Sequence, residues 1–90
     1  MATIKKKCWP RFFEGLVSGK KKFEFRLNDF EAKEGDTLIL EEWDPEKKAY
    51  TGRKLEKKIT YVIHFKVNDL MKFWSKEDVE KYGLQLFSLE

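Results

Sequence analysis

Residues 20–27 constrain the fold more than any other part of this chain, because their apolar and charged residues alternate. Successive side chains of a strand point to opposite faces, so Phe23, Phe25 and Leu27 fall on one side of an extended backbone. The charged residues between them fall on the other side: Lys22, Glu24 and Arg26. This alternation predicts a half-buried strand.

Other segments rich in β-branched and aromatic residues also predict strands. Residues 36–43 are apolar enough for a central strand, and residues 53–67 have the longest strand pattern. Residues 44–52 contain the turn-forming residues of a hairpin connection between these two strands. We also expect short strands at residues 5–9 and 84–89.

Helices are expected at three places. Pro10 at a first helical position, followed by apolar residues spaced for one buried face, predicts a helix that ends at Gly19. Residues 70–74 are expected to form a helical turn. Ser75 is a good N-cap for a last helix, because acidic residues follow it in the first turn and Gly83 ends the pattern.

The length of the chain leaves room for one domain, residues 1–90, and not for two. Its residues are 41% hydrophobic, 16% aromatic and 39% charged, which is typical of a compact globule rather than of a disordered chain. Five or so strands with short helices predict a small α+β domain whose sheet curls toward a barrel.

Composition also argues against several classes of protein. The longest apolar runs are far shorter than the roughly 20 residues that span a bilayer, and no apolar region follows the basic N-terminal residues. Cys8 is the only cysteine and His64 the only histidine, which predicts no disulfide, no metal site and no cofactor. We therefore expect a cytoplasmic protein without a membrane partner.

The net charge of +3 combines segments of opposite sign. Residues 1–30 and 51–72 have an excess of lysine and arginine, whereas residues 31–50 and 73–90 have an excess of aspartate and glutamate. A basic face of this kind attracts a phosphate backbone. The alternative is ordinary solvated charge on a small domain.

The residues around the first alternating segment form a motif. Gly19, Lys21, Glu24 and Arg26 have the spacing G-x-K-x-x-E-x-R, and this resembles the signature of the ASCH domain family. Residues 35–62 contain Gly-Asp-Thr-Leu-Ile-Leu-Glu-Glu-Trp-Asp-Pro, Tyr-Thr-Gly-Arg and Ile-Thr-Tyr-Val, which are similar to a bacterial and phage-associated, uncharacterised branch of that family. The resemblance implies RNA recognition by a PUA-like fold, a curled mixed β-barrel of about five or six strands with two or three short helices.

The resemblance also implies a ligand site in a cleft beside the motif. Lys20 and Lys21 would reach phosphate or carbonyl oxygens. Glu24 and Arg26 share one strand face, where they present an acceptor and a donor to a base. The alternative is that they form only an ion pair at the barrel rim. Arg53 and the lysines near it would extend the basic face.

Three further side chains are expected at the rim of this cleft. Trp43 would stack on a base if it borders the cleft, and otherwise closes the end of the barrel. Trp9 is either a wall of the cleft or a core residue, and Asn28 follows the alternating segment. Trp74 is expected in the core beneath the last helix. The expected partner is RNA or a modified nucleotide.

Two alternative functions stay open. Some small members of the superfamily resemble amidohydrolases that act on N4-acetylcytidine with a threonine nucleophile. Glu24 stands where that threonine would be, which disfavours the same chemistry, but Lys21 and Glu24 are candidate acid and base groups for another hydrolase or a ribonuclease-like enzyme. His64 is expected to be a packed or exposed strand residue, and Cys8 a small apolar one. The third hypothesis is a protein-interaction adaptor that uses residues 31–50.

Overall fold

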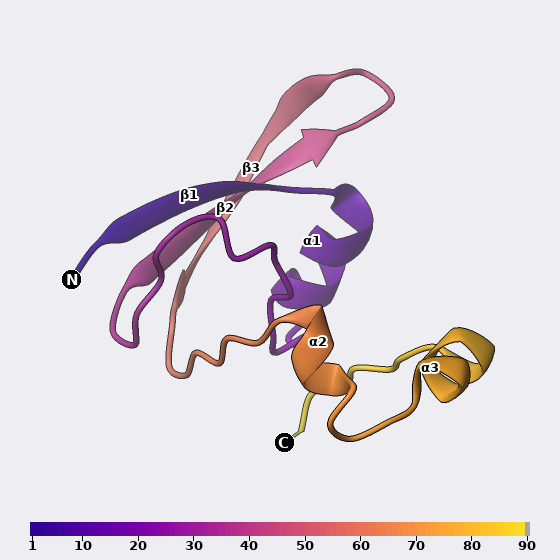
Figure 1. The fold of residues 1–90 in the computed structure, drawn as a ribbon. Helices are drawn as coiled ribbons and strands as arrows, with labels where there is room; N and C mark the ends of the chain where they lie inside the picture. Colours follow the sequence, from indigo (N-terminus) through magenta and orange to yellow (C-terminus); the bar gives the residue numbers. More distant parts are fainter. Residues whose placement is uncertain (90) are drawn as a thin grey trace.

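Three strands and three short helices make up the computed structural model of the chain, which describes residues 1–89 (Figure 1). In chain order they are β1 (Thr3–Cys8), α1 (Pro10–Val17), β2 (Thr37–Asp44), β3 (Ala49–Lys58), α2 (Val67–Leu70) and α3 (Lys76–Tyr82). The predicted α+β class is confirmed.

Strand β2 lies at the centre of the sheet, between β1 and β3. It pairs in parallel with β1, where Cys8 is opposite Glu42. It pairs antiparallel with β3, where Leu40 is opposite Leu55. A parallel pair needs a long crossover connection, and α1 together with residues 18–36 supplies it.

The core lies between α1 and one face of the sheet. Its buried side chains come from β1, α1 and β2: Cys8, Phe13, Leu16, Leu38 and Leu40. Phe13 and Leu16 are three positions apart on α1, so they share one helix face. Leu38 and Leu40 alternate with half-buried residues along β2. Burial of each large side chain contributes about 1.5–3 kcal/mol relative to exposure.

Helix α1 begins at Pro10 as the sequence predicts and ends at Val17, two residues before Gly19, and α3 lies between Ser75 and Gly83 as predicted. Pro10 takes the first position of α1, where a backbone N–H would have no helical partner. The chain leaves α1 through Gly19, whose φ of +80° is a left-handed conformation that favours glycine. The hydroxyl of Ser75 accepts a hydrogen bond from the Asp78 N–H at 3.1 Å, and α3 ends before Gly83.

The strand predictions are wrong at several places in the described part of the chain. Residues 20–27 and 84–89 form no strand, and the strand expected at residues 53–67 begins earlier and ends at Lys58. The sheet has three strands rather than about five or six, and the expected barrel is not confirmed. Phe25 and Leu27 are exposed, and although the ring centres of Phe25 and Phe65 are 6.2 Å apart, the core does not cover this side of the alternating segment.

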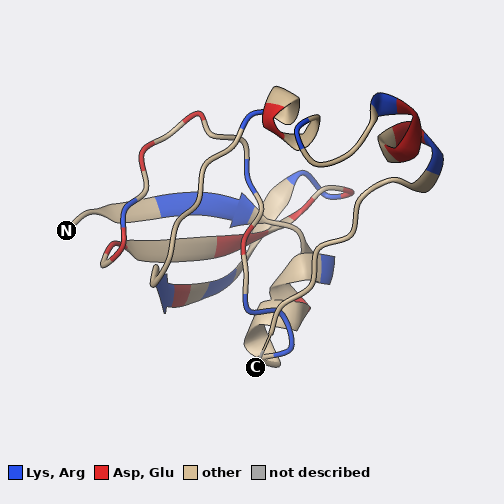
Figure 2. Cartoon of the chain, turned by 60° about the horizontal axis from the view of Figure 1, so that its bottom comes forward, with Lys and Arg blue, Asp and Glu red and all other residues tan. Residues whose placement is uncertain are grey.

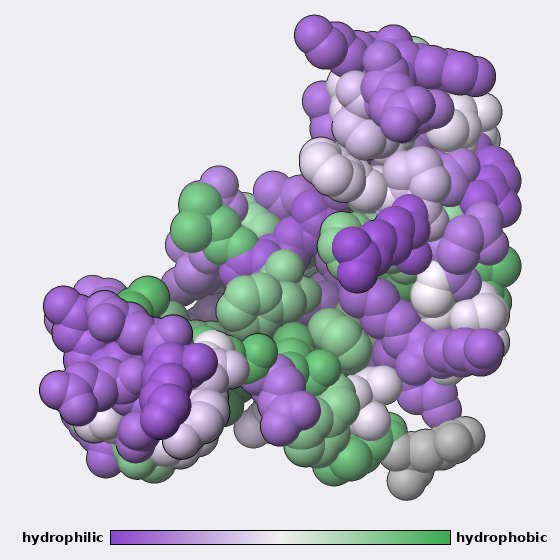
Figure 3. All heavy atoms as spheres, turned by 90° about the vertical axis from the view of Figure 1, so that its right-hand side faces the viewer, coloured by the Kyte–Doolittle hydropathy of each residue, from purple (hydrophilic) through white to green (hydrophobic). Residues whose placement is uncertain are grey.

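Residues after Lys58 add little to the core. Figure 3 views the molecule from the side of α3 and shows apolar side chains at the surface. Phe73 is 74% exposed, and Trp74 is 50% exposed rather than buried as expected. Helix α3 has no buried residue and is polar around most of its surface, so it lacks the apolar stripe that would cover Trp74.

Candidate functional site

The motif residues meet beside α1 and the edge strand β1. Lys21 Nζ donates a hydrogen bond to Glu24 Oε1 at 2.7 Å, and Arg26 Nε donates one to Glu24 Oε2 at 2.8 Å. Glu24 therefore joins both cations through separate oxygens. We call Lys21, Glu24 and Arg26 the motif cluster. Its two cations and one anion give it one net positive charge.

Backbone contacts hold the motif cluster to two elements. Arg26 Nη2 donates to the backbone carbonyl of Lys7 in β1 at 2.7 Å. The Lys21 N–H donates to the carbonyl of Gly15 in α1 at 2.9 Å. An edge strand such as β1 has backbone groups on its outer side that no neighbouring strand pairs. The Arg26 guanidinium pairs with one of them, the Lys7 carbonyl. The sequence around Gly19 thus folds back so that the cluster bridges α1 and β1.

The motif cluster is partly shielded from water. The side chains of Lys21, Glu24 and Arg26 are 18%, 19% and 28% exposed. The ammonium of Lys21 also lies 5.6 Å and 5.1 Å from the ring centres of Phe12 and Phe23. Aromatic faces attract cations, and partial burial strengthens ion pairs relative to fully exposed ones. The positions of both cations are therefore well defined.

A shallow hollow of about 360 Å³ lies at the start of the motif and is lined by residues next to the cluster in sequence and by the C-terminal segment: Ser18, Gly19, Lys20, Lys22, Ser88 and Leu89. The hydroxyl of Ser88 donates to the Lys20 carbonyl at 3.3 Å, so the C-terminal segment passes beside the motif. Ser88 was not among the residues expected from the sequence. It lies 68 positions from Lys20, and no local pattern links the two.

The rim residues do not gather around the motif cluster. Asn28 is exposed in a bend after the motif, and none of the polar contacts found within residues 1–89 joins it to Lys21, Glu24 or Arg26. Trp9 is exposed just before α1. The expectation that Trp43 borders the same cleft needs correction. Glu42, the residue before Trp43 in β2, is buried on the α1 side. Successive side chains of a strand alternate, so Trp43 points to the opposite face of the sheet.

A second charged network lies under the β2–β3 hairpin. Glu42, whose side chain is 5% exposed, accepts hydrogen bonds from Arg53 Nε at 2.9 Å and Arg53 Nη2 at 2.7 Å. It also accepts one from the Thr51 hydroxyl at 2.6 Å, and Arg53 pairs with Glu14 of α1. These hydrogen bonds lower the pKa of Glu42 to about 2, and the two carboxylates raise the pKa of Arg53. Arg53 therefore joins α1 to β3 rather than extending a basic face.

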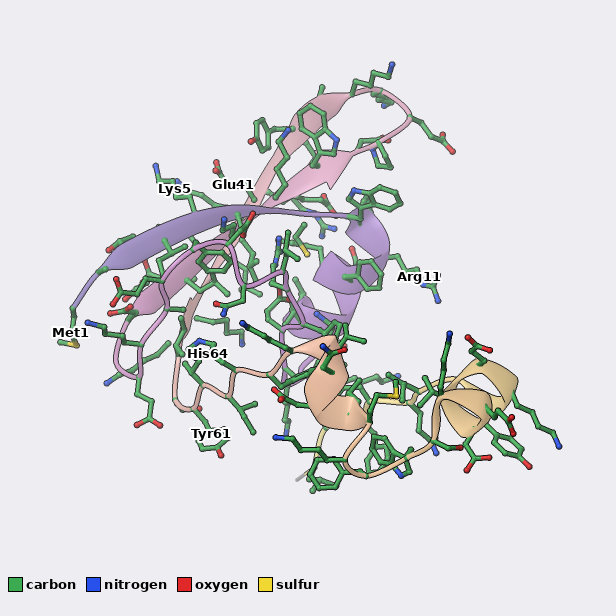
Figure 4. All side chains as sticks on the ribbon, viewed as in Figure 1. Met1, Lys5, Arg11, Glu41, Tyr61 and His64 are labelled. Carbon is green, nitrogen blue, oxygen red and sulfur yellow. The ribbon has the colours of Figure 1, made fainter. Side chains whose placement is uncertain are left out.

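The lone histidine does not belong to either network. His64 is exposed on residues 59–66, which form no strand. Figure 4 shows His64 and Tyr61 on the opposite side of the strands from Lys5 and Glu41. The expected strand position of His64 is therefore wrong, and its side chain lies in solvent.

Two negative findings hold for residues 1–89. No three side chains of His, Cys, Asp or Glu lie close enough together to hold a metal ion. No helix has the length and apolar character needed to cross a bilayer.

Comparisons with known proteins extend over most of these elements. The sequence model of a family described as "Domain of unknown function (DUF3850)" matches residues 3–75, which include the motif cluster and all three strands. A relative from Escherichia phage P2, the "Uncharacterized 12.9 kDa protein in GpA 3'region", is 45% identical over 56 residues. The aligned residues are 62% of this chain and 50% of the relative, so the chain spans about half of the relative's length. The predicted link to phage-associated proteins is confirmed by this relative, and no solved structure matches.

Proposed function

The chain belongs to the DUF3850 family of domains of unknown function, and we propose that it is an RNA-binding or modified-nucleotide-binding module. The ligand site is the motif cluster together with the hollow beside it. One observation carries the proposal: Glu24 holds Lys21 and Arg26 at 2.7 Å and 2.8 Å in a partly exposed group with a net positive charge. Fixed cationic donors of this kind suit a phosphate or the acceptor edge of a base.

The charge around the cluster supports an anionic ligand. Lys20 is exposed and lines the hollow at the start of the motif, so it adds a third cation next to Lys21 in the chain. In Figure 2 the basic residues concentrate on β1 and on the segment that follows α1. A phosphate approaching the cluster therefore meets positive charge on both sides of it.

Binding is favoured over hydrolysis by the state of Glu24. A general base must be free to take a proton from water or from a substrate hydroxyl. Both carboxylate oxygens of Glu24 already accept hydrogen bonds from cations. The same contacts make Glu24 well suited to hold Lys21 and Arg26 in position, and we assign it that role.

The relation to ASCH domains and to PUA-like barrels is part of the same proposal. It is supported by the G-x-K-x-x-E-x-R spacing and by the position of the motif directly after α1 and beside β1. A barrel would need additional strands along the free edges of β1 and β3. Residues 20–27 and 84–89 are the segments whose patterns suit that role.

The test is the affinity for a short single-stranded RNA measured by fluorescence anisotropy over a range of salt concentrations. Lys20→Gln is expected to weaken binding and to lower the slope of log affinity against log salt by about 0.7, because one phosphate contact is lost. Lys76→Gln, which removes the same charge from α3, serves as the control and is expected to change neither quantity. Equal losses in both variants would indicate non-specific attraction and contradict the proposal.

A further inference from the structure

The face of the sheet opposite α1 has a different set of side chains from the motif cluster. The strand register forms rows on this face, with Glu41 between Lys7 and Lys54, and with Trp43 opposite Tyr50. We call the surface formed by Lys5, Lys7, Glu41, Trp43, Tyr50 and Lys54 the open face.

Helices α1 and α2 lie on the other side of the strands from the open face (Figure 1). Lys6, which points to the α1 side, has its ammonium 3.8 Å from the ring centre of Phe30, so residues 18–36 cover that side as well. Lys5 and Glu41 point away from this covered side (Figure 4). The open face is therefore accessible to a large ligand.

Two aromatic rings stand together on the open face. The ring centres of Trp43 and Tyr50 are 5.0 Å apart and the ring planes make an angle of 77°. This edge-to-face arrangement leaves ring surface that the partner ring does not cover. Tyr50 is 51% exposed. Both residues are fixed by strand pairing, so the pair forms a rigid platform at the hairpin end of the sheet.

Positive charge surrounds this aromatic pair. The ammonium of Lys7 lies 3.8 Å from the ring centre of Trp43 and 5.8 Å from that of Tyr50. Lys5 and Lys54 are exposed on the flanking strands, and Glu41 is the acidic residue between them. Farther along β3, Glu56 and Lys58 balance each other. The open face therefore has an excess of positive charge around a stacking platform.

We propose that the open face binds single-stranded nucleic acid. A base stacks on the Trp43–Tyr50 pair, and neighbouring phosphates contact the lysines of the two outer strands. Aromatic rings with adjacent cations on a sheet are the arrangement that binds unpaired bases and their phosphates. A base on the indole displaces the Lys7 ammonium from the ring, and the ammonium then contacts the adjacent phosphate. A duplex keeps its bases stacked on each other, so it does not use this platform.

This inference rests on the proposed function for the chemical nature of the ligand, and it adds a second contact surface. Lys7 links the two surfaces, because its carbonyl accepts a hydrogen bond from Arg26 while its ammonium lies over Trp43. A strand that passes around the edge of β1 contacts both the motif cluster and the open face.

The experiment is a titration of the ¹⁵N-labelled full chain with a short oligouridine, followed through the indole N–H signals of its three tryptophans. The Trp43 signal is expected to shift, while the Trp9 and Trp74 signals act as internal references and stay in place. Tyr50→Leu is expected to weaken the affinity by about 5- to 150-fold, the range for loss of one stacked base. Tyr82→Leu, which removes an exposed tyrosine from α3, is expected to leave the affinity unchanged. Duplex RNA is expected to leave the Trp43 signal in place.

The outcomes separate the two proposals. An unshifted Trp43 signal at saturation, or equal affinity in the two tyrosine variants, overturns the open-face inference, and shifts confined to residues 19–26 would leave the motif site standing. Loss of binding in Tyr50→Leu with full binding in Lys20→Gln would support the open face and contradict the motif site. If Tyr50→Leu does not fold, Lys7→Gln serves in its place. For Lys7→Gln the slope of log affinity against log salt is expected to fall by about 0.7. An unchanged slope overturns the inference.

Discussion

Arg26 donates a 2.7 Å hydrogen bond from its guanidinium to the backbone carbonyl of Lys7, so the motif and the edge strand β1 form one structural unit. The same guanidinium donates to Glu24, which in turn accepts from Lys21. Arg26 therefore has two roles: it presents a cation at the surface and it holds the segment after α1 against the sheet. An alanine at this position would remove both at once.

Arg26→Lys separates these roles, because lysine keeps the charge but lacks the planar set of donors that reaches Glu24 and Lys7 together. We expect the free energy of unfolding to fall by about 1 kcal/mol, the usual net value of a lost hydrogen bond. Urea denaturation measures it. Arg11→Lys is the matched control, since Arg11 points away from α1 into solvent (Figure 4). A loss no larger than that of the control would mean that the contact with β1 adds nothing to stability.

The ion pair between buried Glu42 and half-exposed Arg53 predicts how stability depends on acid. The pKa of Glu42 in the folded chain is about 2, below its ordinary value of 4.5. A lowered pKa contributes stability that is fully present above pH 4.5 and is lost as the pH falls toward 2. Asp36 contributes in the same direction, because hydrogen bonds from the Ala2 and Lys33 N–H groups lower its pKa as well.

Glu42→Gln is therefore expected to destabilise the chain at neutral pH and to flatten the loss of stability between pH 4.5 and pH 2. Thermal unfolding measured across that interval gives the slope. Glu41→Gln, one residue away on the open face, is expected to leave the slope close to that of the native chain. The same steep acid dependence in Glu42→Gln as in the native chain would show that another group controls it.

The sequence predicted correctly those helix ends that depend on residues close together in the chain. Pro10, Ser75 and Gly83 mark helix ends through contacts within a few residues, and the structure confirms them. The strand patterns at residues 20–27 and 84–89 failed because alternation describes only what a segment would bury as a strand. It does not show that a neighbouring strand or an apolar surface is available to receive it.

The candidate site was predictable to a similar extent. The spacing of Glu24 and Arg26 allowed their ion pair, and the structure forms it. Trp43 lies apart from that pair because it is on the face of β2 opposite α1. Which face of β2 becomes the core face is decided by the packing of α1. Ser88 contacts the carbonyl of Lys20, which is 68 positions away in the chain, and no pattern in the sequence indicates this contact.

Cys8 gives a prediction about chemical reactivity. Its side chain is buried in the core, and burial, followed by the nearby charge of Glu24, raises the pKa of the thiol. The thiolate is the reactive form, so alkylation by iodoacetamide is expected to be slow in the folded chain near neutral pH and fast in urea. Mass spectrometry over time measures both rates. Equal rates in the two conditions would mean that the core around Cys8 opens readily.

Amide hydrogen exchange tests the proposed relation to a PUA-like barrel. If residues 20–27 and 84–89 pair with the sheet in solution, their amides exchange as slowly as those of β2. Fast exchange in both segments, with slow exchange in β2, would contradict closure of the barrel and leave the three-stranded open sheet as the fold. The measurement needs only the native chain and its assigned spectrum.

Mapping the ligand onto the backbone tests whether the motif cluster binds RNA or a modified nucleotide. The ¹⁵N-labelled chain is titrated with short single-stranded RNAs and with modified cytidine and uridine nucleosides at moderate salt. Saturable shifts are expected in the amides of residues 19–26, with smaller shifts in β1 at Lys7. Saturating ligand that leaves residues 19–26 unshifted would contradict binding at the motif cluster.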